Sequence, residues 1–205
     1  MVFDQWLLLE VLAVAGNLVY TVFMMLNRRV GWLFGIAASS IGIFIFMHQS
    51  VFAQAALNLF YVIMGVYGWW SWGRKGGMEL PITRRPFIFH IGIMIVGAVA
   101  TWLIAKGLAM LPGSQHVLLD GFVTGFSLLA TWMLARRILE NWGYWIMADA
   151  FAIWLYIQLD LYWYAGLFAI YVILSIMGLI RWRNEWKRSE EPVPTDRITP
   201  GPANL

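Results

Sequence analysis

Seven long apolar runs dominate this chain of 205 residues and restrict what it can fold into. Each run has 17 to 25 residues, and an α-helix needs about 20 to cross the roughly 30 Å of bilayer hydrocarbon. The predicted spans are Trp6–Leu26, Val30–Met47, Val51–Trp72, Phe87–Leu111, Val117–Ala135, Gly143–Leu159 and Leu161–Ile180. The sequence therefore predicts an all-α integral membrane protein with seven transmembrane helices, most of them joined as short antiparallel hairpins.

The composition agrees with a membrane-embedded chain. Only 12% of the residues are charged and 61% are hydrophobic, whereas about a quarter of a soluble domain is charged. Lipid must therefore solvate part of the surface. The chain has no cysteine, which excludes disulfides, cysteine-ligated metals and a thiol nucleophile.

Basic residues predict the orientation of the helices. When the connections are assigned alternately to the two sides, 13 of the 14 lysines and arginines fall on one side and only Lys106 lies near the other. Such residues are retained in the cytoplasm. We therefore expect the N-terminus outside and the C-terminus inside, with the basic residues explained by topology rather than by a nucleic-acid partner.

The chain contains an internal repeat. A shift of 110 positions aligns residues 5–75 with residues 115–185 without a gap, and sixteen of the 71 pairs are identical. The matched pairs include Trp32 with Trp142, Tyr61 with Tyr171, Gly68 with Gly178, and Trp72 with Trp182. Self-similarity at a fixed spacing indicates repeated structural units.

The repeat predicts a 3+1+3 arrangement of two parallel three-helix repeats. Three helices leave the chain on the wrong side for a second copy in the same orientation, so one linking helix is needed. The expected parts are a first bundle (1–75), a cytoplasmic loop with the linker helix (76–111), a second bundle (112–185) and a disordered cytoplasmic tail (186–205). In transporters built this way, the substrate site lies near the membrane midplane between the repeats.

Three carboxylates lie within the predicted spans, where an ionisable group is a functional candidate because its burial is costly. Glu10 and Asp120 occupy equivalent positions in the repeat, and a structural hydrogen bond explains them as well as a function does. Asp149 lies deeper, opposite Ser39 in the repeat. For Asp149 we favour a contact with ligand or pathway over a purely structural bond.

Polar and aromatic residues form a stripe along the third span. Helical spacing aligns Asn58, Tyr61, Gly65, Trp69 and Trp72. An amide, a phenol and indoles suit a flat polar aromatic ligand, and indole faces attract cations. The alternative is an interfacial aromatic belt, which we favour for Trp70 and leave open for Trp69 and Trp72.

Enzyme chemistry has no support in the sequence. His48, His90 and His116 lie far apart near span ends, and no nucleophile–base pair, metal-ligand spacing or phosphate-binding loop is present. We therefore expect a protein that is not an enzyme and has no cofactor or metal. A channel or membrane scaffold remains an alternative, although the sequence shows isolated polar positions rather than a continuous polar stripe.

Several short motifs resemble those of one transporter family. The run Tyr67-Gly68-Trp69-Trp70-Ser71-Trp72 resembles the Tyr-Gly-Trp-x-x-Trp signature that closes the third helix of the PnuC nicotinamide riboside transporters. Glu140-Asn141-Trp142 followed by Trp145 is similar to the start of that family's sixth helix. Asp149 falls where members carry Asn or Asp, and Gly178 with Trp182 matches the closing motif.

This resemblance implies uptake of a vitamin-like nucleoside, nicotinamide riboside, by facilitated diffusion through the bacterial inner membrane. It further implies a homotrimer in lipid and a cytoplasmic kinase that traps the product for NAD biosynthesis. Many members carry Gln where this chain has Asn58, and related branches carry thiamine or riboflavin, so these remain alternative substrates. The expected ligand-binding residues are Asn58, Tyr61, Trp69, Trp72, Trp145, Asp149 and Tyr171.

The predicted orientation has a direct test. Cysteines introduced at Ser50 and Ser114 should react with an impermeant thiol reagent added to whole cells, whereas one at Gly76 should not. The native chain lacks cysteine, so no background labelling interferes. The reverse labelling pattern would overturn the orientation.

Overall fold

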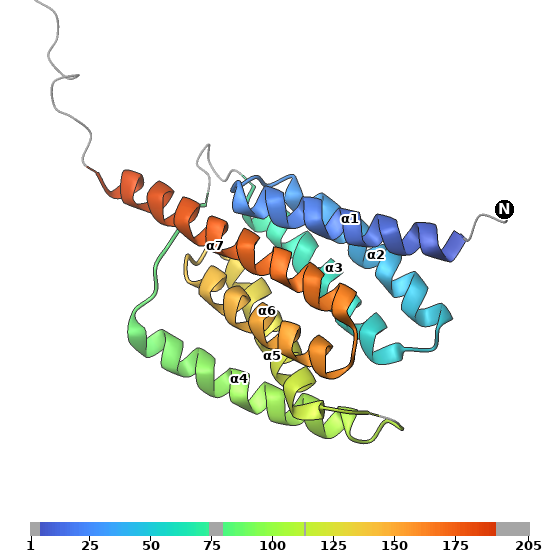
Figure 1. The fold of residues 1–205 in the computed structure, drawn as a ribbon. Coiled ribbons are helices and arrows are strands. Elements are labelled where there is room, and N and C mark those ends of the chain that lie inside the picture. Colours follow the sequence, from blue (N-terminus) through green and yellow to red (C-terminus); the bar gives the residue numbers. More distant parts are fainter. Residues whose placement is uncertain (1–4, 74–79, 113, 192–205) are drawn as a thin grey trace, which may run out of the picture.

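The described residues, 5–73, 80–112 and 114–191, form seven α-helices in the computed structural model (Figure 1). The helices are α1 (Gln5–Met25), α2 (Gly31–His48), α3 (Phe52–Ser71), α4 (Phe87–Leu108), α5 (Val117–Ala135), α6 (Asn141–Gln158) and α7 (Tyr162–Glu190). Each coincides with one predicted span, so the all-α class and the number of helices are confirmed for the described part of the chain.

Helix α7 is longer than the span predicted for it. It continues past Ile180 to Glu190, so the predicted tail at 186–205 begins inside a helix. The polar extension carries an ion pair one helical turn apart, with 3.2 Å between Arg181 Nε and Glu185 Oε1. Residues 192–205 of the predicted tail lie outside the described residues.

Six of the seven described helices are long and apolar enough to cross a membrane, and α6 is the exception. Helix α6 contains Asn141 and Asp149, and both side chains are buried by neighbouring helices. These two polar side chains therefore face protein rather than lipid. The prediction that α6 also spans the membrane stays a prediction.

Six helices form a closed ring, and α4 lies outside it. Consecutive helices pack together within the first three and within the last three, and the ring closes where α1 meets α7 and where α3 meets α5. Helix α4 packs along α5 at the edge of the molecule (Figure 1). Each ring helix thus has two neighbours within the ring, and α5 also contacts α4.

Left-handed residues end four of the helices. Asn27, Ser50, Arg137 and Asp160 have φ between 50° and 58° and follow α1, α2, α5 and α6. A residue in this conformation terminates a helix and reverses the chain. Asn27 and Arg137 are 110 positions apart, as are Ser50 and Asp160, so corresponding turns have the same backbone geometry.

Four buried indoles form a row across the ring, here called the tryptophan row. Its members, Trp32, Trp72, Trp182 and Trp142, are each at most 1% exposed. Successive ring centroids are 5.6, 5.8 and 5.5 Å apart. The two outer contacts are edge-to-face, an arrangement that aromatic rings favour.

The two central indoles also hydrogen bond across the ring. Trp72 Nε1 donates to the carbonyl oxygen of Ala135 at the end of α5, at 3.1 Å. Trp182 Nε1 donates to the carbonyl oxygen of Met24 near the end of α1, at 3.0 Å. One bond therefore has its donor beside the first three helices and its acceptor in the last three, and the other bond has the reverse arrangement.

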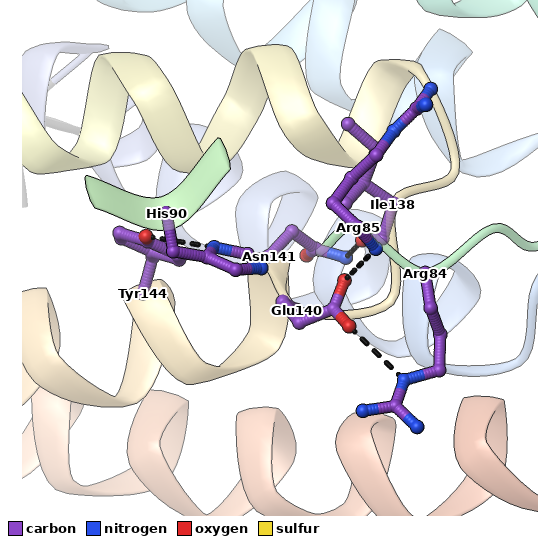
Figure 2. A network of polar contacts seen from close by, with 7 residues as sticks. All are labelled: Arg84, Arg85, His90, Ile138, Glu140, Asn141 and Tyr144. Carbon is purple, nitrogen blue, oxygen red and sulfur yellow. Dashed lines mark hydrogen bonds and ion pairs between the residues drawn. The ribbon is translucent and has the colours of Figure 1, made fainter. Parts of the chain in front are cut away.

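A polar network fixes the segment before α4 to the turn between α5 and α6 (Figure 2). Glu140 accepts hydrogen bonds from Arg84 Nε at 3.2 Å and from the Arg85 backbone N–H at 3.3 Å. Asn141 Nδ2 donates to the Ile138 carbonyl at 2.7 Å. The Glu140-Asn141 motif therefore holds a loop in place rather than facing the centre of the ring.

The tryptophan row requires glycine beneath its outer indoles. A Cβ at Gly178 would lie 2.7 Å from the Trp142 ring, whereas one at Gly166 on the same helix would meet nothing within 4 Å. Gly178→Ala should therefore destabilise the protein by roughly 1–3 kcal/mol, as overpacking does. Thermal unfolding in detergent should show a lower Tm for this variant.

Gly166→Ala is the matched control and should leave Tm unchanged or slightly raised, because alanine favours the helix. Equal Tm values for the two variants would show that the row tolerates displacement of Trp142.

Candidate functional site

Polar side chains from five helices of the ring converge near its centre, and we call them the central polar cluster. Asp149 of α6 is 3% exposed and lies within hydrogen-bonding range of the buried Ser175 of α7. Tyr61 of α3 reaches Ser127 of α5 and lies close to Asp149. The members are Tyr20, Tyr61, Ser127, Asp149, Tyr156, Tyr171 and Ser175.

Asp149 carries the carboxyl group of this cluster. The side chains grouped around it are phenols and hydroxyls, and the described members include no lysine or arginine. A buried carboxylate without a basic partner is costly. A cationic ligand would supply the missing charge, and the faces of the surrounding phenols would attract it further. The cluster is therefore suited to a flat cation with polar substituents.

Three of the predicted ligand-binding residues, Tyr61, Asp149 and Tyr171, meet in this cluster. Asp149 lies close to both tyrosines, which come from the third helix of each set of three. Their contact with a ligand stays a prediction.

The other four predicted residues lie elsewhere. The Arg29 guanidinium carbon lies 3.8 Å from the centroid of the Trp69 ring. The Trp69 backbone carbonyl also accepts a 2.6 Å hydrogen bond from Arg29 Nε. Trp72 belongs to the tryptophan row. Asn58 donates to the Gln54 carbonyl at 2.9 Å, and Trp145 packs half-buried between the two hydrophobic cores.

The glycine of the predicted stripe packs against a helix. A Cβ at Gly65 would lie 2.6 Å from Ile36 of α2, so the absence of a side chain lets α2 approach α3. A Cβ at Gly42 of α2 would likewise lie 2.4 Å from the Asn58 amide oxygen. This part of the stripe therefore contributes to the α2–α3 interface.

The two shallower carboxylates differ in their surroundings. Glu10 is exposed on α1. Asp120 of α5 lies 3.5 Å from the Thr124 hydroxyl and lines a cavity of about 490 Å³ beside the turn that follows α6. Their equivalence in the repeat is therefore not matched by an equivalent environment.

Sequence reasoning missed four members of the central polar cluster, Tyr20, Ser127, Tyr156 and Ser175. Serine and tyrosine are tolerated throughout membrane helices, where they bond to a neighbouring helix or lie at an interface. Their identity alone therefore gives no signal. Ser175 lies 110 positions after Gly65, so its hydroxyl is also a departure from the repeat.

Comparison with known proteins agrees with this architecture. The model of the family described as "Nicotinamide mononucleotide transporter" matches residues 7–184. Two relatives, from Escherichia coli (strain K12) and Shigella flexneri, are named "Nicotinamide riboside transporter PnuC". Each is 22% identical to this chain over 186 residues, covering 78% of both proteins.

A solved structure has the same fold. The chain resembles the "Crystal structure of the Vitamin B3 transporter PnuC" with a TM-score of 0.70 and 21% identity, covering 90% of this chain and 83% of that one. Because the family model spans nearly all of the helical region, the chain belongs to the nicotinamide mononucleotide transporter family, that of the PnuC transporters.

Proposed function

We propose that this protein carries nicotinamide riboside across the bacterial inner membrane by facilitated diffusion. The observation that carries the proposal is the buried Asp149 carboxylate, surrounded by phenols and hydroxyls in the centre of a helical ring. Nicotinamide riboside joins a flat pyridinium cation to a polar ribose. The carboxylate matches the cation, and the hydroxyl groups match the sugar. The names of the two relatives support the same substrate.

Thiamine is the second candidate because it is also a flat aromatic cation. The same carboxylate and phenol faces would serve it, so the geometry alone favours cations over neutral vitamins. Riboflavin is uncharged and gains nothing from Asp149. The substrate named for the relatives favours nicotinamide riboside over thiamine.

We further infer that the ring consists of two parallel three-helix repeats, with α6 as a seventh spanning helix and α4 as the linker. Support comes from the paired left-handed turns and from the equivalent contacts of α1 with α7 and of α5 with α3. The charge asymmetry supports a cytoplasmic C-terminus. A homotrimer and a kinase that traps the product complete the proposal.

Transport by this protein should be uniport. None of the predicted spans contains a proline. The sequence therefore does not predict the broken helices that are typical of ion-coupled carriers. Proteoliposomes holding unlabelled nicotinamide riboside should exchange it for external labelled substrate without a pH or sodium gradient. The exchange should stop at equal concentrations on both sides.

Liposomes without protein provide the control for leakage. Accumulation above equality under an imposed proton or sodium gradient, with no kinase present, would contradict uniport. Exchange of thiamine but not of nicotinamide riboside would replace the proposed substrate.

A further inference from the structure

Four aromatic rings form a continuous series between α6 and α7. Tyr164 and Phe168 of α7 both stack on Tyr156 of α6, with ring centroids 5.3 and 5.2 Å apart. Phe168 in turn meets Tyr171 edge-to-face at 5.7 Å, and Tyr171 lies close to Asp149. We call these four rings the aromatic ladder. It leads from Tyr164, which is 51% exposed, to the central polar cluster.

The outer end of the aromatic ladder lies beside the cavity of about 490 Å³ that Asp120 lines. Asp120 lies close to Tyr156, and Gln158 and Asp160 of the turn between α6 and α7 form another part of the cavity wall. The described residues that line this cavity include two carboxylates and no lysine or arginine. A cavity lined by one sign of charge concentrates ions of the opposite sign. It should therefore attract a cation to the point where the ladder begins.

Polar side chains follow the same course along α5. Asp120 lies close to Tyr156, and Ser127 is within hydrogen-bonding range of Tyr61. Residues spaced three and four apart share one face of a helix, so this face of α5 is turned toward the interior of the ring at both points. The polar residues with this spacing, here called the α5 stripe, are Asp120, Thr124, Ser127 and Thr131.

Helix packing alone does not account for the aromatic ladder. In the repeat, Gln54 is equivalent to Tyr164 and Asn58 to Phe168, and α2 packs on α3 as α6 packs on α7. The first three helices therefore make the same kind of contact with amide side chains at these positions. The ladder belongs to the second set of three helices, which also carries Asp149.

We propose that the aromatic ladder and the α5 stripe are the two walls of a path by which a flat organic cation moves between the outer cavity and Asp149. Ring faces attract a cation through several weak contacts, so it can pass from one ring to the next. The hydroxyl groups of the α5 stripe offer hydrogen bonds to polar substituents. At the other end of the ring lies the tryptophan row. The identity of the cation, but not the path, rests on the proposed function.

A single cysteine in place of Thr124 reports whether a reagent enters this path, because the native chain has no cysteine. The probes are two methanethiosulfonates of similar size, one with a trimethylammonium group and one with a sulfonate group. Each rate of modification is divided by the rate of the same reagent with a small thiol in solution. The cationic reagent should then be favoured at least roughly tenfold in the full-length protein.

Removal of two ladder rings should reduce this preference. In the Thr124→Cys background, Tyr164→Leu/Phe168→Leu keeps apolar side chains but removes two faces, and the preference for the cationic reagent should fall at least roughly threefold. Tyr164→Phe/Phe168→Tyr keeps both faces and should keep the preference. Trp163→Leu is the matched control, since it removes a ring that is 94% exposed at the neighbouring position, and it should have no effect.

Three results would overturn the path: no modification of the cysteine, an unchanged preference in the leucine variant, or an equal fall in Trp163→Leu. If the leucine pair does not fold, as judged from Tm, Tyr164→Leu alone provides the same test at the exposed end of the ladder.

Nicotinamide riboside enters only in a last arm, where it should slow modification by the cationic reagent. A preserved cation preference without this protection would support the path and contradict nicotinamide riboside as its cargo. Failure of the path and failure of the proposed function are therefore distinguished.

Discussion

Trp72 and Trp182 each donate an indole N–H to a carbonyl at the end of a helix in the opposite set of three. Lipid offers little hydrophobic drive for helices to associate, so close packing and such hydrogen bonds must hold a membrane bundle together. The last carbonyls of a helix also lack partners within that helix. The two indole bonds therefore add to the Asn27 N–H on the Met24 carbonyl and to the Ser71 hydroxyl on the Ala135 carbonyl, and they close the ring around the central polar cluster.

The tryptophan row forms an aromatic layer at the end of the ring where α3 ends and α2 and α6 begin. The tryptophan row packs to exclude solvent, with its outer indoles seated on Gly68 and Gly178. A cavity of about 760 Å³ lies at this end of the ring, with Trp72 in its wall, and within the ring lies the cluster around Asp149.

Much of the fold follows from the lengths of the apolar runs, because a helix must satisfy its own backbone in lipid. All seven helices lie where those lengths predict them. The extension of α7 to Glu190 was missed because a polar sequence ends a span without ending a helix. The depth of Asp149 in its span and the equivalence of Tyr61 and Tyr171 in the repeat likewise indicated three of the seven members of the central polar cluster.

The remaining parts of the site depend on which neighbour each helix face meets. Spacing places Asn58, Tyr61 and Gly65 on one stripe, yet α2 covers Asn58 and Gly65 while Tyr61 faces α5 and α6. Trp69 and Trp72 meet arginines, which lie far from them in the sequence. Helical periodicity gives the direction of a side chain relative to its own axis only. Which neighbouring residue the side chain contacts is known only from the tertiary structure.

Calorimetric titration of the purified protein with nicotinamide riboside tests most directly whether Asp149 supplies the counter-charge for a transported cation. Asp149→Asn keeps the size of the side chain and one oxygen that can accept a bond from Ser175, while it removes the ability to ionise and replaces the other oxygen with an NH2 donor. Nicotinamide riboside should bind the wild-type protein, and the substitution should weaken that binding at least roughly tenfold, as loss of a buried charge partner does. Equal affinity in the two proteins would contradict the assignment of the central polar cluster as the cation site.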